Sequence, residues 1–178
     1  MRAQREIRPL KHVELGPFVQ QADRGRHSYQ PRLTLHTAPH RAASIPSIDS
    51  IASNTPIMLV YIDGSAIRNG RPDAQAGWGV YFPNPGLNDL SSYGRLPGDL
   101  QTNNRAELYA MLKALQLFRG DGRPLTIRCD SRYVKDCMDN WRWKWKRNGW
   151  LTVRGTSVLN RDLIEDIEAE FGRLSDRA

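Results

Sequence analysis

Tyr61-Ile62-Asp63-Gly64-Ser65 is the stretch that decides the fold of this chain. It closes a continuous apolar run that begins at Ile57, and such a run, rich in β-branched and aromatic residues, is typical of a buried central strand. Asp63 is therefore predicted at the exit of that strand, where rigid backbone holds it. A carboxylate in such a place is costly to keep charged unless a cation or hydrogen-bond donors satisfy it. The alternative is an ordinary Asp that starts a Gly turn.

The composition favours a polyanionic partner. The chain has 178 residues and a formal net charge of +7, which is enough length for one domain plus an extension and favours nucleic acid over an acidic small molecule. No apolar run approaches the roughly 18 residues of a membrane span, so we expect no membrane partner. Cys129 and Cys137 fall in a predicted strand and helix and are expected to be reduced, which indicates an intracellular protein. We expect a monomer.

Residues 1–55 differ from the rest of the chain. They contain several prolines and all four histidines, and no helical or strand period persists in them, so we predict a poorly ordered basic extension. Glu6 and Glu14 interrupt the basic residues and argue against a clean transit peptide. Nucleus, cytoplasm and mitochondrion all stay open. The folded domain is predicted over residues 56–178.

The domain is predicted to be α/β. Strands over residues 57–62, 77–82 and 92–96 are joined by hairpin-length links, including a polar loop over 64–76, and are therefore antiparallel. Apolar residues at helical spacing predict a helix over 103–118. A fourth strand over 125–129 follows that helix, and this crossover makes the fourth strand parallel to the first.

Three acids are predicted to converge at one end of this sheet. Asp63 and Asp130 follow the two parallel strands, and Glu107 lies in the first turn of the helix. Three such carboxylates repel one another unless cations balance them, and hard oxygen ligands suit Mg²⁺ or Mn²⁺. Taken singly, Glu107 is also placed to close a capping box with Asn104, and Asp130 to cap the next helix. The coincidence of all three on a basic chain favours a metal site.

The C-terminal part combines tryptophans with positive charge. A short helix is predicted over 132–141 and a last helix over 160–174. The segment Trp141–Trp150 holds four of the five tryptophans and five positive charges, and it contains no acidic residue. Lys and Arg side chains there are suited to neutralise phosphates. The tryptophans either stack on a ligand or fill the core, and we favour the core for Trp141, Trp145 and Trp150.

Four stretches resemble, in this order, the type 1 ribonucleases H: Tyr61–Ser65, Thr102–Leu108, Cys129–Val134 and Trp145–Trp150. The similarity covers about residues 57–174, and the second and third stretches are highly specific. The resemblance implies a ribonuclease H-like fold, in which a mixed sheet of three antiparallel strands and a parallel fourth carries flanking helices. It also implies Mg²⁺-dependent or Mn²⁺-dependent endonucleolytic cleavage of the RNA strand of RNA–DNA hybrids by a two-metal-ion mechanism.

The resemblance further implies residue roles. Asp63, Glu107 and Asp130 would be the catalytic residues and three of the family's four metal-binding carboxylates, with Asp63 bridging both ions. The implied nucleic-acid contacts are Asn103, Asn104 and Ser131 near the acids, together with Trp143, Lys144, Lys146 and Arg147 in a basic protrusion that grips the DNA strand.

The chain also departs from the family pattern. The family's last strand, its His-containing loop and the last helix with the fourth carboxylate have no counterpart before Ala178. We therefore expect the fourth strand to be exposed along one edge. The alternative function is a catalytically impaired or inactive ribonuclease H-like module that binds nucleic acid. An integrase-like or reverse-transcriptase-associated relative is a third, less favoured, interpretation.

Overall fold

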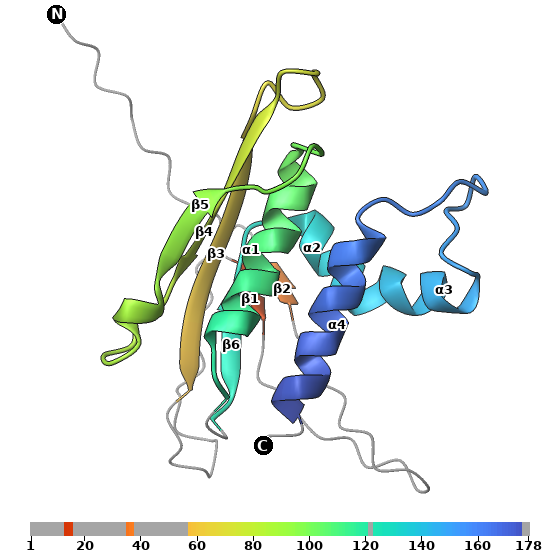
Figure 1. Ribbon diagram of the computed structural model, residues 1–178. Helices are drawn as coiled ribbons and strands as arrows, with labels where there is room; N and C mark the ends of the chain where they lie inside the picture. The colour runs from red at the N-terminus through yellow and green to blue at the C-terminus, as the bar shows by residue number, and fades with distance from the viewer. Residues whose placement is uncertain (1–12, 16–34, 38–56, 121–122, 176–178) are drawn as a thin grey trace, which may run out of the picture.

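The computed structural model describes residues 13–15, 35–37, 57–120 and 123–175 (Figure 1). One mixed sheet has the strand order β2-β1-β6-β3-β4-β5. Its strands are β1 (Val13–Leu15), β2 (Leu35–Thr37), β3 (Met58–Ile67), β4 (Gln75–Tyr81), β5 (Ser92–Arg95) and β6 (Leu125–Arg128). The helices are α1 (Asn103–Leu117), α2 (Arg132–Asp136), the π-helix η3 (Cys137–Trp141), α3 (Arg142–Arg147) and α4 (Arg161–Ser175), with a short 3-10 helix, η2 (Asn88–Leu90).

Strand β3 is the centre of the sheet. It pairs antiparallel with β4 and parallel with β6, and β4 pairs antiparallel with β5, which confirms the predicted arrangement of four strands. Along β3 the side chains of Met58, Val60 and Ile62 are buried, as expected for alternate residues on the covered face of a sheet.

The predicted exit of this strand at Asp63 is wrong. Strand β3 continues to Ile67, because its ladder with β4 runs unbroken from Tyr61 opposite Tyr81 to Ile67 opposite Gln75. What ends near Asp63 is the parallel neighbour: β6 stops at Arg128, which pairs with Tyr61. Asp63 therefore lies just beyond the end of β6, in rigid strand backbone.

Gly64 brings helix α1 against the sheet. A Cβ atom at this position would lie 2.2 Å from the Glu107 backbone nitrogen and 2.3 Å from the Ala106 carbonyl carbon. The glycine therefore allows a close approach of helix and strand, and the alternative in which Asp63 starts a Gly turn is wrong. Helix α1 then covers β3 and β4 with a buried apolar face that includes Leu108, Met111 and Leu115.

The start of α1 differs from the predicted capping box. Thr102 is the N-cap, and its side chain accepts a hydrogen bond from the Arg105 backbone nitrogen. Glu107 is thus the fifth residue of a helix that begins at Asn103, and it lies beyond the position from which a capping-box acid reaches back. Its carboxylate is free for another role.

Helix α1 covers one face of the sheet and α4 packs against α1, and Figure 1 shows helices α1 to α4 on the same side of the sheet. Helix α4 buries Leu163, Ile164, Ile167 and Phe171 along one stripe, which confirms the predicted last helix and its inward face. None of the helices that the structure describes is long and apolar enough to cross a membrane.

The short helix predicted to end at Trp141 is longer. Helices α2, η3 and α3 follow one another without a break from Arg132 to Arg147. Arg142, expected in an exposed basic segment, is buried, and its Nε donates to the Met138 carbonyl oxygen. Helical backbone satisfies the polar groups of this segment internally, so it packs against the core.

Two short strands come from residues 1–55, where the sequence predicted none. Strand β1 pairs antiparallel with β2, and Glu14 pairs with Arg128 of β6. The edge of β6 that was expected to be exposed therefore carries a strand at that point, which satisfies otherwise unpaired backbone groups. The rest of the predicted extension lies outside the described residues.

Candidate metal and nucleic-acid site

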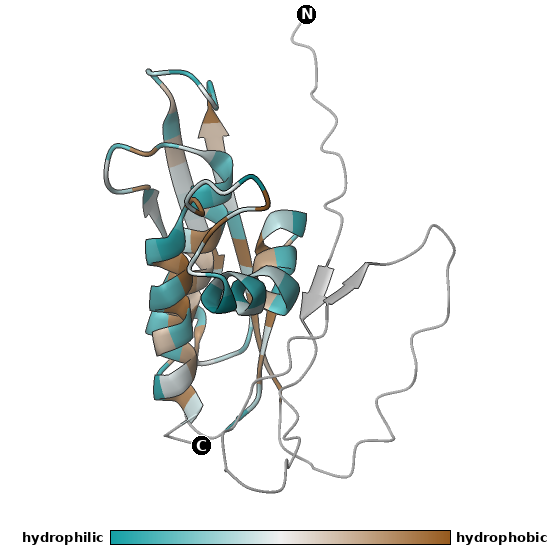
Figure 2. Cartoon of the chain, turned by 90° about the vertical axis from the view of Figure 1, so that its right-hand side faces the viewer, coloured by the Kyte–Doolittle hydropathy of each residue, from teal (hydrophilic) through white to brown (hydrophobic). Residues whose placement is uncertain are grey.

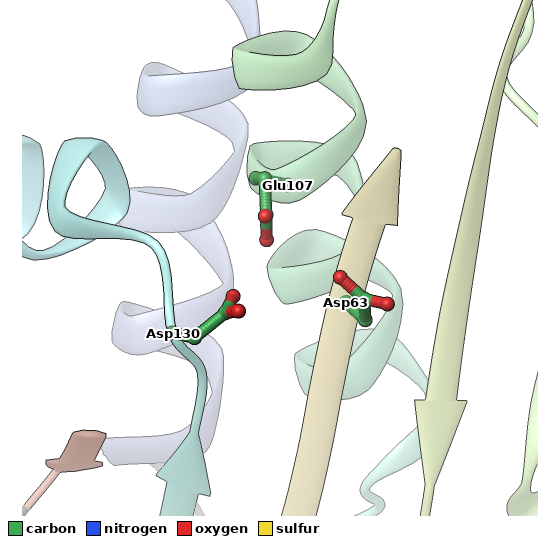
Figure 3. A group of neighbouring side chains, drawn as sticks. All are labelled: Asp63, Glu107 and Asp130. Carbon is green, nitrogen blue, oxygen red and sulfur yellow. The ribbon is translucent and has the colours of Figure 1, made fainter. Parts of the chain in front are cut away.

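The structure brings Asp63, Glu107 and Asp130 together. Each offers a carboxylate oxygen, and these oxygens all lie within 4.8 Å of one another. The three side chains come from β3, from α1 and from the residue two places after β6, and they point toward a common space (Figure 3). The three predicted metal ligands are therefore one cluster.

Local geometry explains this convergence. Asp63 and Asp130 are exposed, whereas Glu107 is only 4% exposed. Because β6 has already ended, none of the described strand residues pairs with Asp63 on that side, and Glu107 reaches this place from α1 above Gly64. Asp63 and Asp130 are 67 positions apart in the sequence, and the parallel pairing of β3 with β6 brings them to the same edge of the sheet.

Glu107 carries the clearest electrostatic signal of the site. Burial raises the pKa of its carboxyl to about 8, and the negative charges of Asp63 and Asp130 add to this rise, while a backbone hydrogen bond from Gly64 lowers it. Its Oε2 is buried without a hydrogen-bond partner among the described residues. An orphaned acceptor beside two further carboxylates is the donor set that a divalent cation prefers, so the residues present fit the predicted Mg²⁺ or Mn²⁺.

Asn103 ties the helix start to the end of β3. Its Oδ1 accepts a hydrogen bond from the Ala66 backbone nitrogen at 3.1 Å, and its own backbone nitrogen donates to Asn69 Oδ1 at 3.0 Å. Asn69 was not predicted as a site residue, although the Asn69-Gly70 pair marks a tight turn in the sequence. The predicted contact Asn104 is exposed beside this junction.

Ser131 is the N-cap of α2. Its Oγ accepts a hydrogen bond from the Val134 backbone nitrogen at 3.3 Å. The alternative in which Asp130 merely caps this helix is therefore wrong, because the neighbouring serine does so. The Asp130 carboxylate is left for the acidic cluster.

In the predicted basic protrusion, Lys146 forms an ion pair, whereas Lys144 and Arg147 are exposed to solvent. Lys146 Nζ lies 2.7 Å from Glu168 Oε2, and the other oxygen of Glu168 lies 3.3 Å from Arg142 Nη1. Lys144 and Arg147 are exposed. In Figure 2, where this side of the molecule faces the viewer, most of the α3 ribbon has the colour of hydrophilic residues.

Trp143 lies between two cations of its own helix. The guanidinium of Arg142 is 4.2 Å and the Lys146 ammonium 5.8 Å from the ring centroid. The remaining tryptophans of the segment join the core: Trp150 is buried, and Trp141 and Trp145 pack against the core cluster. This confirms the core interpretation of those three side chains.

A hydrogen-bond network centred on Arg105 and Asn160 was not predicted from the sequence. Arg105 donates to both carboxylate oxygens of Asp162 and to Asn160 Oδ1, and Asn160 Nδ2 donates to Tyr133 Oη. These contacts join α1 and α2 to the start of α4. No local pattern marks them, since the Arg105 partners are 55 and 57 residues away.

The chain has clear relatives. Residues 55–174 match the family model described as RNase H. A ribonuclease H of Schizosaccharomyces pombe is 46% identical over 106 residues, which are 60% of this chain and 38% of the relative. Ribonuclease H1 of Mus musculus is 38% identical over 127 residues, 71% of this chain and 44% of the relative. A ribonuclease H of Neisseria gonorrhoeae is 40% identical over 122 residues, 67% of this chain and 77% of the relative.

Solved structures agree on the fold. A foamy viral protease-reverse transcriptase in complex with RNA/DNA hybrid aligns with a TM-score of 0.55 at 20% identity, covering 79% of this chain and 20% of the viral one. At that identity the likeness concerns the fold alone. The chain spans less than half the length of the fission yeast and mouse relatives.

Proposed function

This chain belongs to the ribonuclease H family, and we propose that it cleaves the RNA strand of RNA–DNA hybrids endonucleolytically with divalent metal ions. The observation that carries the proposal is the cluster of Asp63, Glu107 and Asp130, with ligand oxygens within 4.8 Å and a buried, orphaned oxygen on Glu107. The names of the relatives support the same reaction.

Mg²⁺ or Mn²⁺ is the proposed cofactor. A pair of such ions would supply a nucleophilic water and would balance the charge of the leaving oxygen in phosphodiester hydrolysis. Asp63, Glu107 and Asp130 would together hold the ions, with Asp63 as the ligand shared by both. The rigid elements beneath the three side chains keep their oxygens in place.

The polar residues around the cluster of three carboxylates are proposed to bind the hybrid. Asn103 and Ser131 flank the acids, and their hydrogen bonds to Ala66 and Val134 fix their side chains in place. Asn104 is exposed beside them. Together these groups are proposed to contact the backbone and 2′-hydroxyls of the RNA strand, because a 2′-hydroxyl both donates and accepts hydrogen bonds.

The protrusion is proposed to hold the DNA strand. Lys144 and Arg147 are exposed on α3 and suited to phosphates, whose neutralisation gives a salt-dependent affinity. Lys146 is partly committed to Glu168, and Trp143 is proposed to pack against sugar. We further propose an intracellular monomer, which the two buried, unpaired cysteines support.

The test is cleavage of a hybrid labelled on each strand in turn, with Mg²⁺ or Mn²⁺. We expect cuts in the RNA strand only, and a loss of rate by orders of magnitude in Asp63→Asn, since the members of a metal site act as a unit. Asn keeps the size of Asp, so unchanged hybrid binding by the variant separates catalysis from folding. A wild-type chain that binds hybrid with a steep salt dependence but never cuts would make it a binding module.

A further inference from the structure

The outer face of the sheet carries a diagonal row of three tyrosines. Along β3, Tyr61 alternates with buried residues and therefore points away from α1. It pairs directly with Tyr81 on β4, and their ring centroids are 6.3 Å apart. Tyr93 on β5 lies opposite Gly79, two residues before Tyr81, so the three rings cross three neighbouring strands on one face.

Two of these rings are open to solvent. Tyr81 is 54% exposed and Tyr93 is 87% exposed. This is unusual, because the large apolar ring of tyrosine is stabilised by burial. Between them Gly79 has nothing within 4 Å of a Cβ position, which leaves the surface flat beside each ring. We call Tyr61, Tyr81 and Tyr93 the tyrosine row.

Positive charge flanks the row. Arg128 on β6 lies beside Tyr61, with its guanidinium 5.7 Å from the ring centroid and Nη1 3.2 Å from the hydroxyl. At the other end Arg95 Nη2 donates to Gln75 Oε1 at 2.9 Å, which holds this guanidinium on the outer face. Flat aromatic rings flanked by arginines suit nucleic-acid bases and phosphates.

The row continues the acidic cluster. Asp63 pairs with Gly79, and Gly79 pairs with Tyr93, on the same face. Tyr93 is thus two strands from Asp63, or about 10 Å. A nucleic-acid strand that reaches the carboxylates is within one or two nucleotides of the tyrosine row.

We propose that the tyrosine row binds the single-stranded flank of a hybrid, with unpaired bases stacked on Tyr81 and Tyr93. Tyr61, braced by Arg128, forms the inner end of the row. Every base can stack on an aromatic ring, so the tyrosine row would add affinity for the substrate without sequence specificity. The inference rests on the proposed function for the hybrid part of the ligand, but stacking itself needs no cleavage.

The experiment compares a blunt hybrid with the same hybrid carrying a four-nucleotide overhang, in EDTA, by fluorescence anisotropy. RNA and DNA overhangs at each end are separate arms, which identify the strand that reaches the row. We expect at least one overhang to raise affinity about tenfold over the blunt hybrid. The double variant Tyr81→Leu, Tyr93→Leu loses that gain, whereas Tyr81→Phe, Tyr93→Phe keeps it because the rings remain.

The ratio of the two affinities within one variant cancels any general loss of folded protein, and thermal unfolding of each variant checks the fold. An oligonucleotide that is single-stranded throughout tests the row without any hybrid, so this arm still reports if the chain fails to cleave. The proposal is overturned if no overhang raises affinity, or if the gain survives in the Leu variant. A concentration-dependent dimer that the Leu variant dissociates, without an overhang gain, assigns the row to a second copy instead.

Discussion

At the scale of single residues, Glu107 is where folding and function oppose each other. Its pKa is raised to about 8, chiefly by burial, so the folded chain holds a proton that the unfolded chain releases at lower pH. The contribution of this group to the free energy of unfolding is complete below the unfolded pKa and is lost as pH rises through the folded one. The acidic cluster thus weakens the fold at neutral pH.

We predict that the metal-free protein loses stability between about pH 4.5 and pH 8, by a few kcal/mol at most, because each pKa unit corresponds to about 1.4 kcal/mol. Urea unfolding in EDTA over this range measures it. Glu107→Gln is neutral throughout, so its curve is expected to be flatter and to lie above the wild type at pH 8. Equal slopes for both proteins would contradict the assigned pKa.

The same carboxyl couples metal binding to pH. Metal ligands bind in their deprotonated form, so we predict that Mn²⁺ binding at pH 7 releases close to one proton from the wild-type chain. Calorimetry in buffers of different ionisation enthalpy gives this number directly. At pH 9.5 the release is expected to vanish, and a release that is equal at both values of pH would exclude Glu107 as its source.

Gly64 allows the backbone of α1 to lie directly against β3. We predict that Gly64→Ala destabilises the protein by about 3 kcal/mol or more, because its Cβ would stand 2.2 Å from backbone of α1 and neither element can shift freely. Gly79→Ala, in the paired strand, is the matched control, since nothing lies within 4 Å of its Cβ. If chemical unfolding shows a similar loss of stability for both variants, the effect of Gly64→Ala would come from strand propensity and not from the contact with α1.

At the scale of elements, α3 is attached to α4 by one carboxylate. Glu168 contacts Arg142, whose side chain is 5% exposed, and Lys146. Desolvation by burial lowers the pKa of Arg142, and the charge of Glu168 opposes this. Removing one partner of a buried pair leaves the other charge uncompensated, so the attachment of the protrusion depends on Glu168.

We predict that Glu168→Gln costs about 2 to 3 kcal/mol of folding stability, somewhat less than a fully buried pair because Lys146 is exposed. Glu165→Gln, on the same helix, breaks an exposed pair with Arg161 and is expected to cost under about 0.5 kcal/mol. Thermal and urea unfolding of the two variants make the comparison. A smaller effect at Glu168 than at Glu165 would show that α3 is held by its tryptophans alone.

At the scale of the whole molecule, the formal charge of +7 favours binding to polyanions. We predict that hybrid affinity falls steeply with salt and that Lys144→Ala and Arg147→Ala each reduce the slope of log affinity against log salt by about 1. Arg119→Ala, two residues after the end of α1, removes the same charge as a control and is expected to leave the slope unchanged. An equal change in all three variants would point to net charge and not to the protrusion.

The sequence was a good guide wherever the pattern was local. The apolar run that ends in Tyr61-Ile62-Asp63 predicted the central strand, helical spacing predicted α1 and α4, and the crossover predicted the parallel pair that brings Asp63 and Asp130 together. The predictions were wrong where a neighbouring strand or residue determines the local structure. Strand β3 continues past Gly64 because β4 pairs with it, and Ser131 caps α2 in place of Asp130.

The sequence by itself determined the central strand, its parallel partner and the three acids, because side-chain periodicity and strand order follow from spacing along the chain. Only the tertiary structure decided that Glu107 is buried, that Gly64 makes room for α1, that Arg142 lies in the core and that Glu168 holds Lys146. Such contacts join residues dozens of positions apart. Their strength depends on burial and charge around them, which no local pattern contains.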